Sequence, residues 1–223
     1  RFSIELVKKF EPDNYKNPFS GGSEMIDADY LLMLQVIGGV GQGNKGEQLY
    51  EYFTSQLKIF ENEIAYASEN INNPEDIIKL RHSVSGASTK YAVSLGGAVK
   101  HRVTPDLSVS PKNILPFIND VKNYCAANSY EAAIFGHIGI GSFHIHIFSR
   151  ISLGSKKDDL ITNLFDITKK YNGSCWSEHG IGTANAKHYK KYTAPQYIDE
   201  WLSYKNKYDP NNILSPRSNG FFC

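Results

Sequence analysis

The sequence predicts an α+β protein whose antiparallel sheet is covered by helices, built from ferredoxin-like split βαβ units and followed by a C-terminal helical segment. Two observations carry this prediction. Strand-like and helix-like segments follow one another in the order strand, helix, strand, and then strand, helix. Two of the strand-like segments are also adjacent and joined by a short glycine-rich loop, which favours an antiparallel hairpin over a doubly wound parallel sheet.

The first strand and helix are predicted between residues 30 and 66. Residues 30–37 form an apolar run, broken only by Gln35, with the length of a buried strand, and residues 38–46 are rich in glycine. Residues 47–66 carry apolar side chains at three- and four-residue spacing, which predicts a helix that packs on the sheet. This stripe consists of Leu49, Tyr52, Phe53, Leu57, Phe60 and Ile64.

A second strand and helix follow in residues 103–121. The alternation of residues 103–109 predicts a strand that ends at Pro111. The helix after it carries Pro116 in its first turn, where a missing N–H costs little. Its apolar positions are Ile114, Leu115, Phe117, Ile118 and Val121.

The last strands and a further helix lie between residues 132 and 171. Residues 132–135 and 143–148 predict neighbouring strands, and the loop 136–142 joins them. Residues 158–171 are amphipathic, with acidic residues at the end where the helix dipole is positive, and predict a helix.

Composition limits the classes of protein to consider. A chain of 223 residues that is 41% hydrophobic can bury a sizeable core, and we expect it to form one unit. The 24 basic and 23 acidic residues give a net charge of +1, too balanced to predict nucleic-acid binding. Neither a run of about 18 apolar residues nor a signal peptide is present, so we expect a soluble domain. Cys125, Cys175 and Cys223 predict neither disulfides nor a thiolate metal site, and favour the cytoplasm or an organellar matrix.

The glycine-rich segment invites a dinucleotide-binding interpretation. Gly41, Gly43 and Gly46 satisfy the pattern G-x-G-x-x-G between a predicted strand and a predicted helix. The alternating strands and helices of such a fold do not follow, because residues 70–76 are loop-like. A connection whose glycines permit positive φ is therefore the preferred interpretation.

Histidines surround the loop 136–142. On an extended strand His144 and His146 share one face, and His137 precedes the turn, where it can fold back toward His144. Such an arrangement allows a metal site with two nitrogen ligands. An isolated pair of histidines is also commonly a packed or surface feature, and the pattern alone leaves both possibilities open.

A second segment, residues 174–182, adds an oxygen ligand. A set of two histidines and Glu178 suits a divalent ion such as zinc, manganese or iron, with positions left for a substrate oxygen. His179 points elsewhere on an extended backbone and is a candidate base. The alternative is a solvated loop held by Gly180 and Gly182.

Four motifs together resemble the C-terminal domain of the FAD-linked oxidases, a family that includes D-lactate dehydrogenases, the flavin subunit of glycolate oxidase and D-2-hydroxyglutarate dehydrogenase. Residues 136–144 resemble its motif G-H-x-G-D-G-N-x-H, and residues 178–182 match E-H-G-x-G. Residues 209–216 are similar to D-P-N-x-I-L-N-P, and residues 106–111 to D-x-S-V-P with one extra serine. The order of the motifs is also the family's order.

The resemblance implies a metal site and a base. In metal-dependent members the matching residues hold a divalent ion, which implies His137, His144 and Glu178 here. The ion would bind the α-hydroxyl and carboxylate of a 2-hydroxyacid and lower the pKa of the hydroxyl. His179 would remove the proton while a hydride moves from the α-carbon to the flavin.

The resemblance also implies contacts with substrate and flavin. Arg81 stands where related enzymes recognise the substrate carboxylate, and Ser85 would share its helical face. Gly141 and Ser142 lie in the motif's flavin-facing turn, where Ile140 replaces the usual aspartate and Ser142 the usual asparagine.

A further departure concerns the substrate. The lysine that some members place just before the strand is Thr104 here, with Lys100 and Arg102 displaced from that position. The substitution argues against a second acidic group on the substrate, and so favours D-lactate or glycolate over D-2-hydroxyglutarate.

The family holds FAD in a separate N-terminal domain. We therefore expect residues 1–223 to be the substrate- and metal-binding half of an FAD-dependent dehydrogenase that works with an FAD-binding domain or subunit outside this chain. Electrons would pass to a cytochrome, a quinone or an iron–sulfur protein, and the whole enzyme could associate peripherally with a membrane. The alternative is a stand-alone metal-binding or interaction domain without catalysis, in which the ion would be closed and four-coordinate. A synthase of the alkyl-glycerone-phosphate type would have consecutive histidines in place of Glu178-His179.

Overall fold

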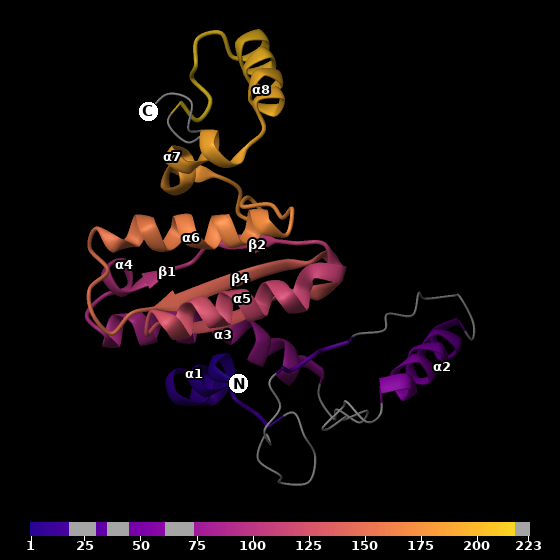
Figure 1. Ribbon diagram of the computed structural model, residues 1–223. Coiled ribbons are helices and arrows are strands. Elements are labelled where there is room, and N and C mark those ends of the chain that lie inside the picture. The colour runs from indigo at the N-terminus through magenta and orange to yellow at the C-terminus, as the bar shows by residue number, and fades with distance from the viewer. Residues whose placement is uncertain (18–29, 35–44, 61–73, 217–223) are drawn as a thin grey trace. The chain divides into compact units, whose positions relative to one another are not determined.

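The computed structural model describes residues 1–17, 30–34, 45–60 and 74–216 (Figure 1). The chain divides into two compact units, Arg1–Ala87 and Ser88–Cys223, and the boundary falls inside the long helix α3 (Pro74–Ser94).

The first unit contains α1 (Phe2–Phe10), α2 (Lys45–Leu57) and the beginning of α3, with 3₁₀ turns η1 (Pro12–Asn14) and η2 (Lys58–Phe60). α1 buries Ile4, Leu6 and Val7. α2 confirms the predicted helix at residues 47–57, whereas residues 58–60 form the 3₁₀ turn η2, and none of the side chains of α2 is buried. A stripe of apolar residues predicts a helix from local spacing and does not specify what covers it.

The strand predicted at residues 30–37 is wrong where the chain is described. Residues 30–34 have no regular secondary structure, and their side chains are exposed. An apolar run becomes a strand only when another strand supplies backbone partners, and none pairs with these five residues. Residues 35–37 and two glycines of the G-x-G-x-x-G pattern, Gly41 and Gly43, lie outside the described residues, whereas Gly46 lies in the first turn of α2.

The second unit holds the sheet. Its strands are β1 (Arg102–Val103), β2 (Asp106–Ser108), β3 (Glu131–His137) and β4 (Ser142–Phe148). β4 is central: β3 pairs with its whole length, while β1 and β2 pair with its two ends, all antiparallel. The predicted hairpin is therefore confirmed. The strand predicted at 103–109 is divided in two, because Pro105 has no N–H for the ladder, although its carbonyl accepts the N–H of Ile145 at 3.1 Å.

Helices accompany the sheet in the expected order. They are α4 (Ala98–His101), α5 (Ile114–Ala127), α6 (Lys156–Lys170), α7 (Gly182–Tyr192) and α8 (Pro195–Tyr208), with 3₁₀ turns η3 (Pro111–Asn113) and η4 (Ile138–Ile140). The predicted helices at 114–121 and 158–171 are confirmed, and Pro116 lies in the first turn of α5. α7 and α8 form the C-terminal helical segment, so the α+β class is confirmed.

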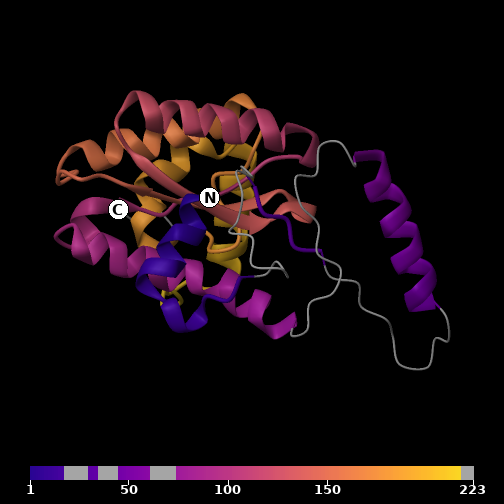
Figure 2. The ribbon, with the colours of Figure 1, turned by 90° about the horizontal axis from the view of Figure 1, so that it is seen from below.

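The core lies between one face of the sheet and the helices α5 and α6 (Figures 1 and 2). Alternate residues of β4, namely Phe143, Ile145 and Ile147, belong to this core, as the two-residue period of a strand requires. The opposite face of β4 carries His144, His146 and Phe148, and the ring of Phe148 packs against Tyr91 of α3. The histidines thus lie on the face away from the main core. Over the described residues, every helix is too short or too polar to cross a membrane.

Candidate metal and substrate site

Three separate segments meet at the histidine face of the sheet: β2, β4 and the turn at residues 178–179. Asp106 of β2 lies directly opposite His144 of β4 in the strand register, and Phe135 of β3 is opposite His144 on the other side. The rings of Phe135 and His144 are 5.2 Å apart between centroids. Pairing of neighbouring strands therefore fixes the position of His144 from both sides.

Asp106 contacts both histidines of the candidate site. Its Oδ1 lies 3.0 Å from Nδ1 of His144, and its Oδ2 lies 3.3 Å from Nδ1 of His179. Oδ2 also accepts a hydrogen bond from the backbone N–H of His179 at 2.7 Å. Asp106, His144 and His179 offer ligand atoms that all lie within 4.8 Å of one another. The sequence motifs predicted His137, His144 and Glu178 as ligands and did not indicate Asp106.

Glu178 approaches His144 from the opposite side of the ring. Oε2 of Glu178 lies 3.4 Å from Nε2 of His144. The side chain of Glu178 is 49% exposed, whereas that of Asp106 is 8% exposed. His144 is thus placed between a buried carboxylate at Nδ1 and a half-exposed carboxylate at Nε2.

An open hollow borders Glu178, lined by Ser108, His137, Ile140, Ser142, Trp176, Ser177 and Glu178. His137 is the exposed last residue of β3 and pairs with Ser142, not with His144. The structure therefore brings His144 and Glu178 into contact and places His137 on the wall of the same hollow. The three-residue ligand set stays a prediction.

The turn that carries Glu178 is tied to β2. Ser108 and Ser174 form an isolated bridge between extended backbones, with N···O distances of 2.9 and 2.8 Å. The backbone N–H of Ser177 donates to the carbonyl of Asp106 at 3.3 Å. The chain then turns at Gly180, whose φ of +66° favours glycine. These contacts position the second motif beside the first.

The turn between β3 and β4 is tightly constrained. Gly141 has a φ of +64°, and a Cβ built there would lie 1.9 Å from the carbonyl oxygen of Val109. The next residue, Ser142, is buried, and its hydroxyl lies 2.6 Å from that of Ser177. Ser142, one of the two predicted flavin contacts, therefore links the motif at residues 136–144 to the segment that carries Glu178.

His146 is a packed neighbour of the site. Its ring lies edge to face with Phe135 at 4.9 Å, and burial, with a smaller contribution from Arg102, lowers the pKa of His146 to about 3. The packing of this buried ring against Phe135 fits the interpretation that His146 supports the strand.

The predicted substrate residues Arg81 and Ser85 both lie on α3, four residues apart and therefore on one side of that helix. Arg81 is half-buried and Ser85 is exposed. They belong to the first unit, whereas the histidines belong to the second, so their role stays a prediction.

A divalent metal fits the donors that are present. Imidazole nitrogens and carboxylate oxygens suit zinc, manganese or iron. Oδ1 of Asp106 is buried and accepts no hydrogen bond of normal geometry among the described residues. A negative group of this kind requires a positive or N–H partner nearby, and Nδ1 of His144 lies 3.0 Å away.

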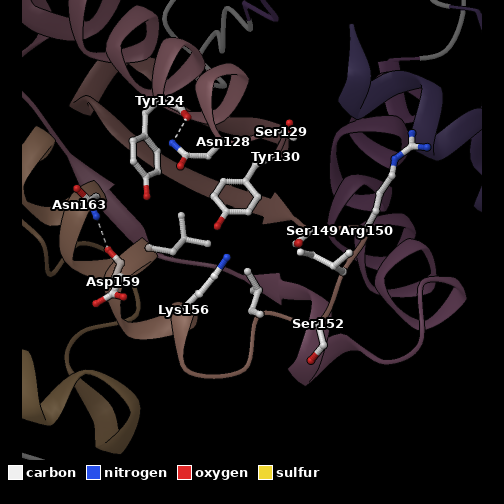
Figure 3. A pocket seen from close by; sticks show the side chains of 13 residues that line it. Tyr124, Asn128, Ser129, Tyr130, Ser149, Arg150, Ser152, Lys156, Asp159 and Asn163 are labelled. Atoms are coloured by element: carbon white, nitrogen blue, oxygen red, sulfur yellow. Dashed lines mark hydrogen bonds between the residues drawn. The ribbon is translucent and has the colours of Figure 1, made fainter.

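A second hollow lies at the other end of β4, where the loop 149–153 meets α5 and α6 (Figure 3). Lys156 points into it beneath Tyr130, whereas Arg150 points away and pairs with Glu131 at 3.0 Å. None of the predicted site residues lines this hollow.

Comparison with known proteins agrees with the motifs. Residues 27–219 match the family described as FAD linked oxidases, C-terminal domain, and the chain belongs to this family. The D-2-hydroxyglutarate dehydrogenase of Haemophilus influenzae is 26% identical, over 85% of this chain and 19% of its own length. The mitochondrial D-2-hydroxyglutarate dehydrogenase of Arabidopsis thaliana is 24% identical, over 96% of this chain and 35% of its own length. An uncharacterized FAD-linked oxidoreductase of Mycobacterium tuberculosis is 29% identical over 49% of this chain. The chain thus spans about a fifth to a third of the first two relatives.

Proposed function

We propose that this chain is the substrate- and metal-binding half of an FAD-dependent dehydrogenase that oxidises 2-hydroxyacids. The observation that carries the proposal is that His144 contacts both Asp106 and Glu178, while Asp106 also contacts His179. These four residues come from three motifs that are far apart in sequence. FAD, held by a separate domain or subunit, supplies the acceptor for a hydride from the α-carbon.

The proposed ligands for a divalent ion are His137, His144 and Glu178. The contact between Nε2 of His144 and Oε2 of Glu178 supports two of them, and the shared hollow supports the third. Zinc, manganese or iron bound there would supply Lewis acidity to a substrate hydroxyl. The set combines one carboxylate with two imidazoles, and His137 and Glu178 line a hollow that is open to solvent, where a small acid can enter.

His179 is the proposed base. Its side chain is 68% exposed, and Nδ1 faces Asp106 at 3.3 Å. This orientation leaves Nε2 for the substrate proton, while the buried carboxylate stabilises the ring once it is charged. The pairing of a base with an orienting carboxylate is a common arrangement in proton-transfer sites.

Arg81 is the proposed contact for the substrate carboxylate, assisted by Ser85.

The substrate is proposed to be a small monocarboxylate such as D-lactate or glycolate. The absence of the family's lysine at Thr104 supports this choice. The displaced cation Arg102 donates to the hydroxyl of Thr89 at 2.9 Å and so is already engaged. Two of the relatives are D-2-hydroxyglutarate dehydrogenases, so a Thr104→Lys variant tests whether one cation shifts preference toward a dicarboxylate.

The electron acceptor is proposed to be a cytochrome, a quinone or an iron–sulfur protein. Gly141 and Ser142 are proposed to face the flavin through the backbone of their turn, since the Ser142 side chain is buried against Ser177.

The decisive test has two parts. Elemental analysis after dialysis without chelator should find about one divalent ion per chain, and a His137→Ala, His144→Ala double variant should lose it. The chain joined to the flavin domain of an FAD-linked oxidase should then reduce FAD with D-lactate or glycolate. A closed, four-coordinate zinc without FAD reduction would instead support a stand-alone metal-binding domain.

A further inference from the structure

Asp106 occupies the centre of the candidate site, although its motif assigns it no role. It is 8% exposed and lies opposite His144 across the β2–β4 ladder. It contacts both histidines, and it belongs neither to the proposed ligand set nor to the proposed base. A buried carboxylate in this position needs a physical explanation.

One part of the explanation is that Asp106 holds the turn that carries Glu178. Its Oδ2 accepts the backbone N–H of His179 at 2.7 Å, and its own carbonyl accepts the N–H of Ser177 at 3.3 Å. Glu178 is thus fixed through both of its chain neighbours. The carboxylate of Glu178 stays half-exposed, but its backbone cannot move away from β2 without breaking these two bonds.

The other part concerns the imidazole of His144. Oδ1 of Asp106 is a buried acceptor without a hydrogen bond of normal geometry among the described residues, and Nδ1 of His144 lies 3.0 Å away. A buried acceptor left without a donor is costly, so the tautomer with its proton on Nδ1 is favoured. The lone pair of the ring is then on Nε2, the atom that lies 3.4 Å from Glu178.

We propose that Asp106 is a positioning residue, which fixes the Nδ1–H tautomer of His144 and holds Glu178 beside Nε2, so that both present their donor atoms to one divalent ion. This inference rests on the proposed function, since it assumes that the ion binds at Nε2. Ligating histidines generally donate their other N–H to a carboxylate or carbonyl, which orients the ring and strengthens the ligand.

The rival interpretation is that Asp106 is itself a ligand, together with His144 and His179, whose atoms are close enough. Exposure argues against it. Asp106 is 8% exposed, whereas Glu178 is 49% exposed and borders the hollow that also contains His137. An ion that enters this hollow therefore meets Glu178, which lines it, and not Asp106, which does not.

The experiment uses the 223-residue chain, three test variants, and a fourth variant, His144→Gln, that serves only to assign NMR signals. Asp106→Asn keeps the shape of the side chain but places an N–H₂ group where an acceptor stood. Glu178→Gln removes a proposed ligand. Asp120→Asn is the matched control, since Asp120 lies on α5 and pairs with Lys170 at 2.6 Å, away from the site.

Three measurements separate the roles. Nitrogen-15 NMR of the metal-free chain, at a pH high enough for the His144 ring to be neutral, reports which ring nitrogen carries the proton. The His144 signals are assigned by their loss in His144→Gln. Competition with a chromophoric chelator gives the dissociation constant for zinc. The visible absorption of bound cobalt(II), at saturation, reports the type and number of ligands.

We expect the Nδ1–H tautomer in the unsubstituted chain and the Nε2–H tautomer in Asp106→Asn, because the amide then donates to Nδ1. Zinc affinity should fall about 10- to 100-fold in Asp106→Asn, as for other losses of a supporting carboxylate. Its cobalt spectrum at saturation should match that of the unsubstituted chain, whereas that of Glu178→Gln should not. Asp120→Asn should change none of the three readouts.

An Nε2–H tautomer in the unsubstituted chain would overturn the proposal, and this result does not depend on any variant folding. A changed cobalt spectrum in Asp106→Asn would make Asp106 a ligand instead. If the unsubstituted chain binds neither zinc nor cobalt, the proposed metal site fails. The tautomer of His144 then still decides whether Asp106 orients that ring.

Discussion

Two helices that the sequence predicts by the same rule differ completely in the structure. α2 (Lys45–Leu57) and α6 (Lys156–Lys170) each carry apolar residues at helical spacing. α6 buries Leu160, Leu164 and Phe165 in the core of its unit, whereas α2 buries no side chain. Spacing determines whether a helix has an apolar side, and the rest of the fold determines whether that side is covered.

This difference implies that similar substitutions in the two helices should have very different effects. Phe165 is 1% exposed and meets Trp176 and Tyr192 edge to face, each at 5.2 Å between ring centroids. Phe53 of α2 is 39% exposed.

Phe165→Ala should have the largest effect. Removal of a fully buried aromatic ring leaves a cavity and should lower the free energy of unfolding by about 3–5 kcal/mol. Urea unfolding followed by circular dichroism measures the change, with Lys156→Ala at an exposed position of the same helix as control. A loss below about 1 kcal/mol would mean that the core around α6 relaxes to fill the space.

Gly141→Ala should come second, and Gly180→Ala is its matched control. Both glycines have left-handed backbones, with φ of +64° and +66°, and a Cβ costs about 1–2 kcal/mol in that conformation. At Gly180 it meets nothing within 4 Å, whereas at Gly141 it lies 1.9 Å from the carbonyl oxygen of Val109. The forced backbone shift should add about 1–3 kcal/mol at Gly141 alone. Equal melting temperatures for the two variants would contradict the close contact.

His188 should make the stability of the second unit depend on pH. It lies on α7 with its ring 5.5 Å from that of Phe165, and burial, assisted by the charge of Lys187, lowers the pKa of His188. The unfolded chain binds this proton near pH 6.5 while the folded chain resists it, so stability is full above that pH and declines below it. The slope should not exceed about 1.4 kcal/mol per pH unit for this one group.

The comparison that isolates this group is between the unsubstituted chain and His188→Phe, with unfolding measured from pH 7.5 to 5. The phenylalanine variant should lose part of the decline below pH 6.5, because it cannot take up the proton. Parallel curves for the two proteins would assign the pH dependence to other groups.

The part of the fold that depends on local pattern could be predicted from the sequence. α5, α6 and the β3–β4 hairpin follow from spacing, turn residues and the tolerance of a first turn for Pro116. The strand predicted at 30–37 could not be judged in this way, since a strand requires a partner that the run itself does not specify. The break at Pro105 could have been foreseen from its missing N–H.

In the candidate site, too, the residues in local motifs could be predicted, whereas those that depend on long-range pairing could not. The motifs identify His144 and Glu178, and the structure places them 3.4 Å apart. Asp106 was missed because its importance depends on the register between β2 and β4, a long-range pairing that places it opposite His144. The available signal was a carboxylate at the first position of the motif at residues 106–111. Only the pairing of β2 with β4 shows that Asp106 meets the ring of His144.

The smallest effect is expected on α2 and gives the sharpest test of the opening comparison. Phe53→Ala removes the same ring as Phe165→Ala, but from a side chain that is already 39% exposed in a helix that buries nothing. Alanine also has a higher helix propensity than phenylalanine, so the two terms nearly cancel, and the free energy of unfolding should change by less than about 0.5 kcal/mol. Urea unfolding under the conditions used for Phe165→Ala measures the difference. A loss of about 2 kcal/mol or more would mean that the apolar side of α2 is covered in solution, because only a buried ring contributes that much. The two helices would then obey one rule, and the contrast between them would disappear.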